Sequence, residues 1–180
     1  MSKIGRKPIP FETAKIEIKD NVVKVSGRVN FVHELPAGIS AAVHGNFLSL
    51  TVQEKTREIS VLWGLHRALL ANKVKGAETG FEQKIIIVGL GYKAQLAGKK
   101  MTLTLGYTHK IDYELPTEVT VDIDKTGQNL LFKSADKFLL GRVCDTMRSF
   151  RPPEPYKGTG IMKAGEVIIR KAGKTKSTAS

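Results

Sequence analysis

The sequence has little cysteine and no long apolar run. Cys144 is the single cysteine among 180 residues, so no disulfide forms within the chain, as is typical of a protein in the reducing cytosol. The longest apolar run, residues 85–88, has the length of a strand and falls far short of the ~18 residues of a membrane helix. No apolar segment follows the first positive charges, so we expect no secretory signal peptide.

Patterns typical of catalytic or metal sites are also missing. The histidines are scattered, and none pairs with another at the helical spacing of a metal site: His33, His44, His66 and His109. We expect His66 to be a packed or half-exposed helix residue. We expect Cys144 to be a small buried apolar residue rather than a reactive thiol. The sequence therefore predicts no enzyme, no cofactor and no metal.

A glycine pair at Gly89 and Gly91 resembles a dinucleotide-binding fingerprint and leaves a nucleotide-dependent enzyme as an alternative. The fingerprint requires a helix to begin at the glycines, with its amide groups facing a pyrophosphate. Here the following residues alternate in polarity and reach another glycine and two lysines at positions 98–100. We therefore favour a tight connection between two strands.

Positive charge is abundant. The chain has 29 Lys and Arg against 17 Asp and Glu, a net charge of +12, with seven basic and two acidic residues in positions 151–180. Such an imbalance attracts a polyanion over long range, and nucleic acid is the commonest. An anionic membrane surface is the rival partner. A basic amphipathic helix with a large apolar face, which a membrane-surface protein would need, is missing.

Apolar and polar residues alternate in many short segments, which predicts half-buried strands. These segments are residues 16–18, 22–25, 39–43, 47–52, 85–88, 92–96, 101–105, 119–123 and 130–132. A helix is predicted from a Thr56 cap to Gly76, with an apolar face of Ile59, Leu62, Trp63, His66, Leu69 and Leu70. A second is predicted from a Ser134 cap to Phe150, with Asp136 in its first turn and an apolar face of Leu139, Val143, Met147 and Phe150.

Two halves of the sequence resemble each other. The tripeptide Glu-Leu-Pro occurs at residues 34–36 and again at 114–116, and residues 22–27 resemble residues 101–106. We interpret this as a duplication. The predicted fold class is α+β, with two tandem copies of a small module, each made of antiparallel sheets packed on one α-helix. The expected domains are residues 1–81 and residues 82–180, the second carrying a proline and glycine loop and a basic tail.

Residues 151–161 combine three prolines with two glycines. Each proline fixes φ and removes a backbone donor, so the segment is predicted to be an extended, exposed loop. Gly158 and Gly160 allow the backbone to turn or to approach a partner closely. Tyr156 and the cations Arg151 and Lys157 suit unstacked bases and phosphates, which predicts contact with RNA.

The residues after this loop extend the basic surface. Residues 166–170 are predicted to form one more strand, and residues 171–180 a polar basic tail that is disordered without a partner. If that strand returns beside the second helix, one surface gathers the candidate phosphate-binding cations Arg142, Arg148, Arg151, Lys157, Lys163, Arg170, Lys171, Lys174 and Lys176. The first residues, 2–11, contain Pro8 and Pro10 and are predicted to form an extended arm.

Specific segments at both ends resemble one family. Residues 2–10, Ser-Lys-Ile-Gly-Arg-Lys-Pro-Ile-Pro, and residues 154–161, Glu-Pro-Tyr-Lys-Gly-Thr-Gly-Ile, are similar to the start and the signature of bacterial large-subunit ribosomal protein six. Residues 63–64 and 67–70 of the first helix and residues 91–93 also resemble that family. The resemblance covers essentially the whole chain.

The resemblance implies a structural protein of the large ribosomal subunit, located in the cytoplasm and without catalytic activity. It implies binding to large-subunit (23S) rRNA, mainly through the C-terminal domain, near the stalk base, the sarcin–ricin loop and the factor-binding region. Neighbouring ribosomal proteins are further implied partners, with no small-molecule substrate. The implied RNA contacts add Tyr156, Gly158, Thr159 and Gly160 to the cations above. Thr159 stands where the family usually has lysine.

Overall fold

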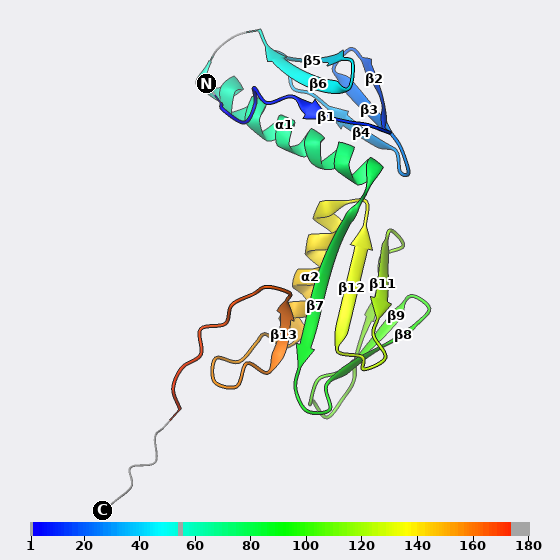
Figure 1. Ribbon diagram of the computed structural model, residues 1–180, viewed down its shortest axis with the longest axis vertical. Helices are drawn as coiled ribbons and strands as arrows, with labels where there is room; N and C mark the ends of the chain where they lie inside the picture. Colours follow the sequence, from blue (N-terminus) through cyan, green and yellow to red (C-terminus); the bar gives the residue numbers. More distant parts are fainter. Residues whose placement is uncertain (1, 54–55, 174–180) are drawn as a thin grey trace, which may run out of the picture. The chain divides into compact units, whose positions relative to one another are not determined.

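Short strands and two helices make up most of the structure (Figure 1). The computed structural model describes residues 2–53 and 56–173. Two compact units result, and we describe each by itself. Unit 1 is Met1–Phe81 with Ala135–Lys137, and unit 2 is Glu82–Ser134 with Phe138–Ser180. The boundary predicted after residue 81 lies close to this division, and whether the units are separate domains stays a prediction.

Unit 1 combines two three-stranded sheets with one helix. Its elements are β1 (Ile9–Pro10), β2 (Lys15–Lys19), β3 (Val22–Ser26), β4 (Phe31–Glu34), β5 (Ile39–His44), β6 (Phe47–Val52) and α1 (Arg57–Glu78). One sheet has the order β2-β3-β4 and the other β1-β6-β5, with antiparallel pairs throughout both. Alternate residues such as Val23, Val25 and Leu48 are buried, and they pack with Leu70 and Val74 of α1.

Helix α1 begins as predicted but ends later. The Thr56 side chain accepts a hydrogen bond from the Ile59 amide at 3.3 Å, which makes Thr56 the N-cap. The helix continues through Gly76 to Glu78, so the predicted end at Gly76 is wrong. Gly76 instead lies against the Ala135 carbonyl, where a Cβ would not fit. Two residues of the predicted apolar face, Leu62 and Leu69, are exposed, whereas Ile59, Trp63 and Leu70 of that face pack in the core.

The first residues of the chain fold back on unit 1 instead of forming an extended arm. Gly5 lies against the Trp63 ring so closely that a Cβ would approach it to 2.5 Å. The Arg67 guanidinium donates to the Lys7 and Pro8 carbonyls at 3.0 and 3.1 Å. Ile9 then pairs with Leu48 in the sheet and is buried. Contacts with α1 therefore fix residues 2–11, whose prolines had predicted an extended arm.

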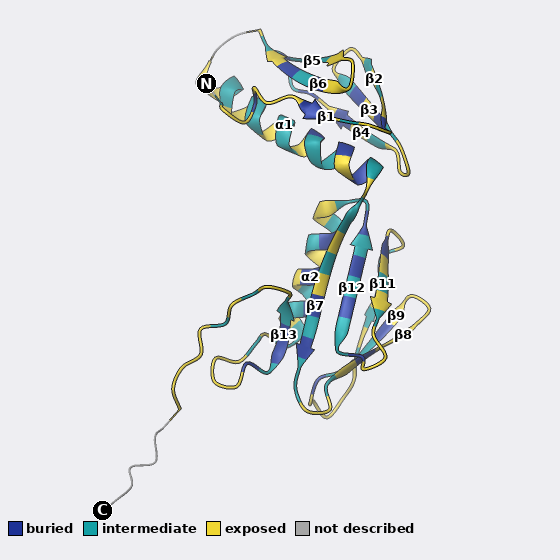
Figure 2. Ribbon diagram, viewed as in Figure 1, coloured by how far each residue is buried: buried dark blue, intermediate teal, exposed yellow. Residues whose placement is uncertain are grey.

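Unit 2 repeats this plan and adds a strand. Its elements are β7 (Phe81–Val88), β8 (Lys93–Ala97), β9 (Lys100–Thr104), β10 (Ile111–Glu114), β11 (Val119–Ile123), β12 (Asn129–Ser134), α2 (Lys137–Phe150) and β13 (Gly160–Lys163). One sheet has the order β8-β9-β10 and the other β11-β12-β7-β13. Buried and half-buried residues alternate along β12 (Figure 2). The predicted α+β class, with antiparallel sheets and one helix in each module, is confirmed.

Backbone hydrogen bonds show the duplication directly. The Leu35 amide donates to the Asn21 carbonyl at 2.7 Å, and the Leu115 amide donates to the Lys99 carbonyl at 2.9 Å, each from the same place in its Glu-Leu-Pro tripeptide. Val22 pairs with Glu34 of the first tripeptide, and Lys100 pairs with Glu114 of the second. Val22 and Lys100 therefore occupy equivalent positions in the two modules. The predicted match of residues 22–27 with 101–106 is therefore wrong by one residue.

The second helix also differs in detail from its prediction. Ser134 is the last residue of β12 and pairs with Val119, so it is not the N-cap. Asp136 directly precedes the first helical residue rather than lying in the first turn. The buried residues of α2 are Leu140, Val143, Cys144 and Met147. The buried face is thus rotated from the predicted one, and Cys144 lies within it.

The C-terminal strand is formed by residues other than those predicted. Gly160–Lys163 pairs antiparallel with β7, from Gly160 opposite Val88 to Lys163 opposite Ile85. Residues 166–170 form no strand, and their apolar side chains Val167 and Ile169 are exposed. The prolines end at residue 155, so residues 160–163 have the backbone donors that a strand needs.

Candidate nucleic-acid interface

The proline and glycine segment of unit 2 is a closed loop held by its own hydrogen bonds. The Glu154 amide donates to the Thr159 carbonyl at 2.9 Å, and the Gly158 amide donates to the Glu154 carbonyl at 3.0 Å. The Lys171 amide donates to the Pro155 carbonyl at 2.9 Å. The predicted loop is therefore closed by hydrogen bonds within the chain itself.

The tip of this loop presents a ring and a cation. Residues 155–157 form its turn, and both Tyr156 and Lys157 are exposed. Tyr156 is 53% exposed. This is a large exposed fraction for an aromatic side chain, since such rings usually bury much of their surface. The loop therefore offers a flat apolar face and a positive charge from a fixed backbone, which is the chemistry that suits unpaired bases and phosphates.

Gly158 and Gly160 are buried and serve the loop itself. A Cβ on Gly160 would lie 2.6 Å from the Pro152 carbonyl oxygen, and its φ of 142° is one that side chains rarely adopt. A Cβ on Gly158, whose φ is 73°, would lie 3.2 Å from the Arg170 guanidinium. These positive φ values agree with the prediction that the two glycines let the backbone turn, and a Cβ at either position would meet residues of the chain itself. Whether the glycines also contact a partner stays a prediction.

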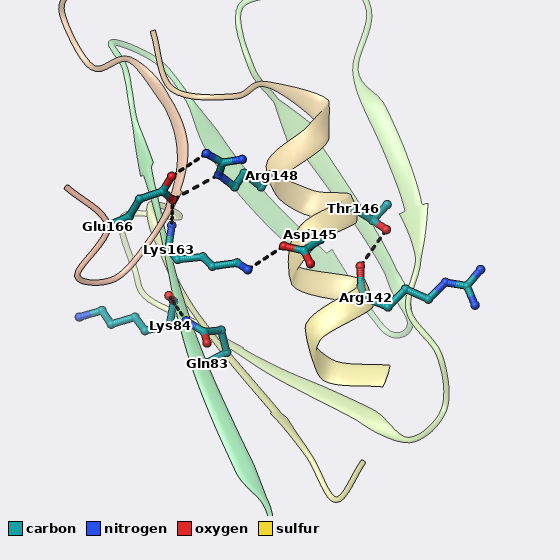
Figure 3. Close-up of polar contacts among 8 residues, drawn as sticks. All are labelled: Gln83, Lys84, Arg142, Asp145, Thr146, Arg148, Lys163 and Glu166. Carbon is teal, nitrogen blue, oxygen red and sulfur yellow. Dashed lines mark hydrogen bonds and ion pairs between the residues drawn. The ribbon is translucent and has the colours of Figure 1, made fainter. Parts of the chain in front are cut away.

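Two of the predicted cations are held in ion pairs with α2 or beside it (Figure 3). Arg148 of α2 donates through Nη2 and Nε to the two carboxylate oxygens of Glu166, at 2.6 and 3.2 Å. Lys163 of β13 lies 2.6 Å from the Asp145 carboxylate of α2. These pairs fasten the C-terminal strand and the residues after it to the helix. The last strand therefore lies beside α2 as expected, although it is β13.

The Arg148 contact also sets the protonation of Glu166. Hydrogen bonds from the Arg148 side chain and then from the Lys163 amide lower the pKa of Glu166. Glu166 therefore stays ionised at neutral pH and pairs with the Arg148 guanidinium. Cys144 is buried, as predicted, and burial raises the pKa of its thiol to about 11.

The remaining candidate residues differ in exposure. Arg142, Arg170 and Lys171 are exposed. Thr159 is half-buried, and its hydroxyl donates to a Glu154 carboxylate oxygen at 3.0 Å. Lys174 and Lys176 lie outside the described residues. The set thus divides into exposed and paired side chains, and the Arg142 side chain points away from the Lys163 and Glu166 side of α2 (Figure 3).

Sequence analysis missed a group of aromatic side chains around Arg151. The Arg151 guanidinium carbon lies 4.7 Å from the ring centre of Tyr107 and 5.6 Å from that of Tyr92. Tyr107 in turn stacks on His109, with ring centres 5.9 Å apart. The sequence does contain a signal for the tyrosines, because Tyr92 and Tyr107 each directly follow a glycine near a strand end. It contains no local pattern that predicts their contact with Arg151, which is distant along the chain.

The structure distinguishes between the two interpretations of the glycine pair at Gly89 and Gly91. The turn at Gly89 joins β7 to β8 without a helix, which confirms the strand connection. Within residues 2–53 and 56–173, no group of three potential His, Cys, Asp or Glu ligands gathers to hold a metal ion. None of the helices in this part of the chain is long and apolar enough to cross a membrane.

The fold and the charge define a class, namely a basic α+β protein of two tandem modules. The family model described as ribosomal protein L6 matches residues 88–164. The chain is 40% identical over 177 residues to large ribosomal subunit protein uL6 of Desulfatibacillum aliphaticivorans, covering 97% of this chain and 99% of that protein. It is 39% identical to the protein of that name from Nostoc sp. over 97% of each chain. It is also 39% identical to that from Chloroherpeton thalassium, over 97% of this chain and 98% of that one.

The chain therefore belongs to the ribosomal protein L6 family. Membership makes it a structural, non-enzymatic protein of the large subunit of the cytoplasmic ribosome.

Proposed function

We propose that the chain binds 23S rRNA in the large ribosomal subunit, mainly through residues 82–180, near the stalk base and the factor-binding region. Neighbouring large-subunit proteins are its other partners. The net charge of +12 supports a polyanionic partner. The names of the relatives, large ribosomal subunit proteins, support the assembly. The two modules would brace segments of RNA that are distant in sequence.

The observation that carries the proposal is the closed loop with Tyr156 and Lys157 at its turn. Because hydrogen bonds already fix this loop, little conformational entropy is lost when RNA binds. Lys157 would neutralise a phosphate, and Tyr156 would stack on a base or a ribose. Gly158, Thr159 and Gly160 would set the shape of the turn beneath them.

The other candidates would act in two groups. Arg142, Arg170, Lys171, Lys174 and Lys176 would supply phosphate contacts, the last two from outside the described residues. Arg148 and Lys163 would hold β13 and its loop against α2, because their charges are already paired. Arg151 would act through the tyrosines that it contacts. We propose the same two-domain division for function, with residues 1–81 as a separate N-terminal domain.

The test is the salt dependence of binding between the full-length chain and transcribed 23S rRNA. Each lost phosphate contact should flatten the slope of log affinity against log salt by about 0.7 to 0.9. Lys157→Ala should therefore weaken binding and flatten the slope by one contact. Lys24→Ala removes an exposed lysine from β3 and is the matched control. Equal affinity and slope for Lys157→Ala and the wild type would refute the assigned contact.

Sedimentation tests the assembly independently. In a sucrose gradient of cell lysate, the protein should migrate with the large subunit and stay there at moderate salt. Migration in the soluble fraction at both low and high salt would refute the role of this chain in the subunit.

A further inference from the structure

Four side chains of unit 2 form a stack with two half-buried and two exposed members, which the proposed contacts of Tyr156 and Lys157 do not include. This Tyr–Arg stack consists of Tyr92, Arg151, Tyr107 and His109. The Arg151 guanidinium lies over both tyrosine rings, at 5.6 Å from Tyr92 and 4.7 Å from Tyr107. The Tyr107 and His109 rings are nearly parallel, with 18° between their planes. The members come from three segments, namely the β7–β8 turn, the β9–β10 loop and the end of α2.

The Tyr92 ring packs against the backbone of two glycines, Gly89 and Gly106. A Cβ on Gly89 would lie 2.4 Å from the Tyr92 ring, and one on Gly106 would lie 2.8 Å from it. Both glycines also have positive φ values, 158° and 75°. The ring therefore lies directly against the backbone of two connections and gives the stack a fixed base.

Tyr107 is held in place without being covered. Its hydroxyl donates to the Phe150 carbonyl at 3.1 Å, and the Arg151 cation lies over its ring. Yet Tyr107 is 43% exposed, and residues 106–110 are exposed throughout. An aromatic side chain that is fixed but still exposed has already lost the rotational freedom that a binding partner would otherwise have to remove.

His109 is an exposed member of the stack. Its ring contacts Tyr107, and among the described residues we find no hydrogen bond or ion pair to its imidazole. Lys110 follows it and is exposed. An exposed ring beside cations on a preformed support matches the stacking surfaces that bind single-stranded nucleic acid.

We propose that an unpaired base of the rRNA stacks on His109, with the Tyr–Arg stack as its rigid support. The inference rests on the proposed binding to 23S rRNA and adds to it a second contact, which is made by stacking. Tyr92 and Arg151 are positioning residues in this contact, since they act through Tyr107. A base that is bulged or in a loop has the free face that this contact requires.

Binding of full-length variants to transcribed 23S rRNA at pH 8, over a series of salt concentrations, tests this contact. His109→Ala should weaken binding about 10-fold, within the range for one stacked base, and leave the salt slope unchanged because stacking releases no counterion. His109→Trp should restore the affinity, since indole keeps the aromatic face. His44→Ala, which removes an exposed histidine from unit 1, should bind as the wild type does.

The outcomes separate this inference from the proposed function. If Lys157→Ala weakens binding but His109→Ala does not, rRNA binding stands and the stacking contact is refuted. If the wild type shows no salt-dependent affinity for 23S rRNA, both are refuted. Weaker binding by His109→Ala that His109→Trp fails to restore also refutes stacking, because the loss would then come from altered folding.

Discussion

Unit 1 and unit 2 share one strand scheme but differ at the edge of a sheet. In unit 1, the strand beside β6 is β1, which has two residues and contains Pro10. In unit 2, the corresponding strand beside β12 is β7, which has eight residues and no proline. Proline cannot donate to a neighbouring strand, so β1 stays an edge, whereas β7 accepts β13 on its other side.

The consequence for function is local. The strand β13 brings the Pro/Gly loop with Tyr156 and Lys157 onto unit 2, and ion pairs to α2 secure it. Unit 1 places a folded N-terminal segment against its helix instead. The module of unit 2 thus carries the candidate binding loop because the free edge of β7 can pair with β13.

The largest effect should come from filling the Gly160 position. Gly160→Val places a branched side chain at a φ of 142° and against Pro152, so β13 should leave the sheet at a cost of about 4 kcal/mol in unfolding free energy. Urea unfolding followed by circular dichroism would measure this loss. Trp63, the single tryptophan, reports on unit 1 alone, and its fluorescence transition should shift less.

Gly141→Ala is the matched control, because a Cβ at that helical glycine meets open space. Alanine there should be neutral or slightly stabilising. Equal unfolding curves for Gly160→Val and the wild type would contradict the role given to this glycine.

Acid should destabilise unit 1 through His33, a buried histidine paired with the half-buried His66. His33 Nε2 lies 3.0 Å from His66 Nδ1, and burial, then the Lys73 ammonium and then His66 lower the pKa of His33 to about 4. A folded-state pKa below the unfolded value means that stability is present above pH ~6.5 and is lost as pH falls toward 4. The Trp63 transition should therefore lose about 2 kcal/mol between pH 7.5 and pH 5.

The control for this prediction is a histidine of the same unit. His33→Phe should flatten the pH dependence of the Trp63 transition, whereas His44→Gln, at an exposed site, should leave it unchanged. A wild-type transition that is flat from pH 7.5 to pH 5 would contradict the prediction.

A smaller effect is expected where β13 is fastened to α2. Glu166→Gln removes the charge that Arg148 contacts through two nitrogens, and unfolding free energy at pH 7 should fall by about 1 kcal/mol. Because the pKa of Glu166 is lowered, the wild type should lose this stability as pH falls below about 4.5, and the variant should not. Asp112→Asn, in a more exposed pair with Lys100, should cost less. A larger loss for Asp112→Asn would reverse this ranking of the two pairs.

The smallest effect is expected at Thr159, where the family resemblance implies a lysine. Thr159→Lys gives up the hydrogen bond to Glu154 but adds a cation beside the loop turn. Its rRNA affinity should rise a few-fold, and its salt slope should steepen by about 0.7 to 0.9 for one added phosphate. Thr159→Gln, of similar length without the charge, is the control. A steeper slope for both variants would show that charge is not the cause.

Local sequence patterns predicted most of the helices and strands, but they aligned the two halves of the chain incorrectly. Residues 119–123 form a strand with the predicted bounds, and Thr56 caps α1. The four-residue strands β4 and β10 were missed, because such short segments show too little alternation. The alignment of the two halves was wrong by one residue. In a strand, that shift exchanges the two faces, and only pairing across the sheet decides between them.

By itself, the sequence determined the class of fold, the duplicated plan and the net positive charge, because these follow from local periodicity and composition. The tertiary structure decided which partner each of the described cations contacts. Arg148 and Arg151 are equally basic in the sequence, yet one contacts Glu166 and the other lies over Tyr107. Those partners are brought together by strand pairing and helix packing, which involve residues distant along the chain.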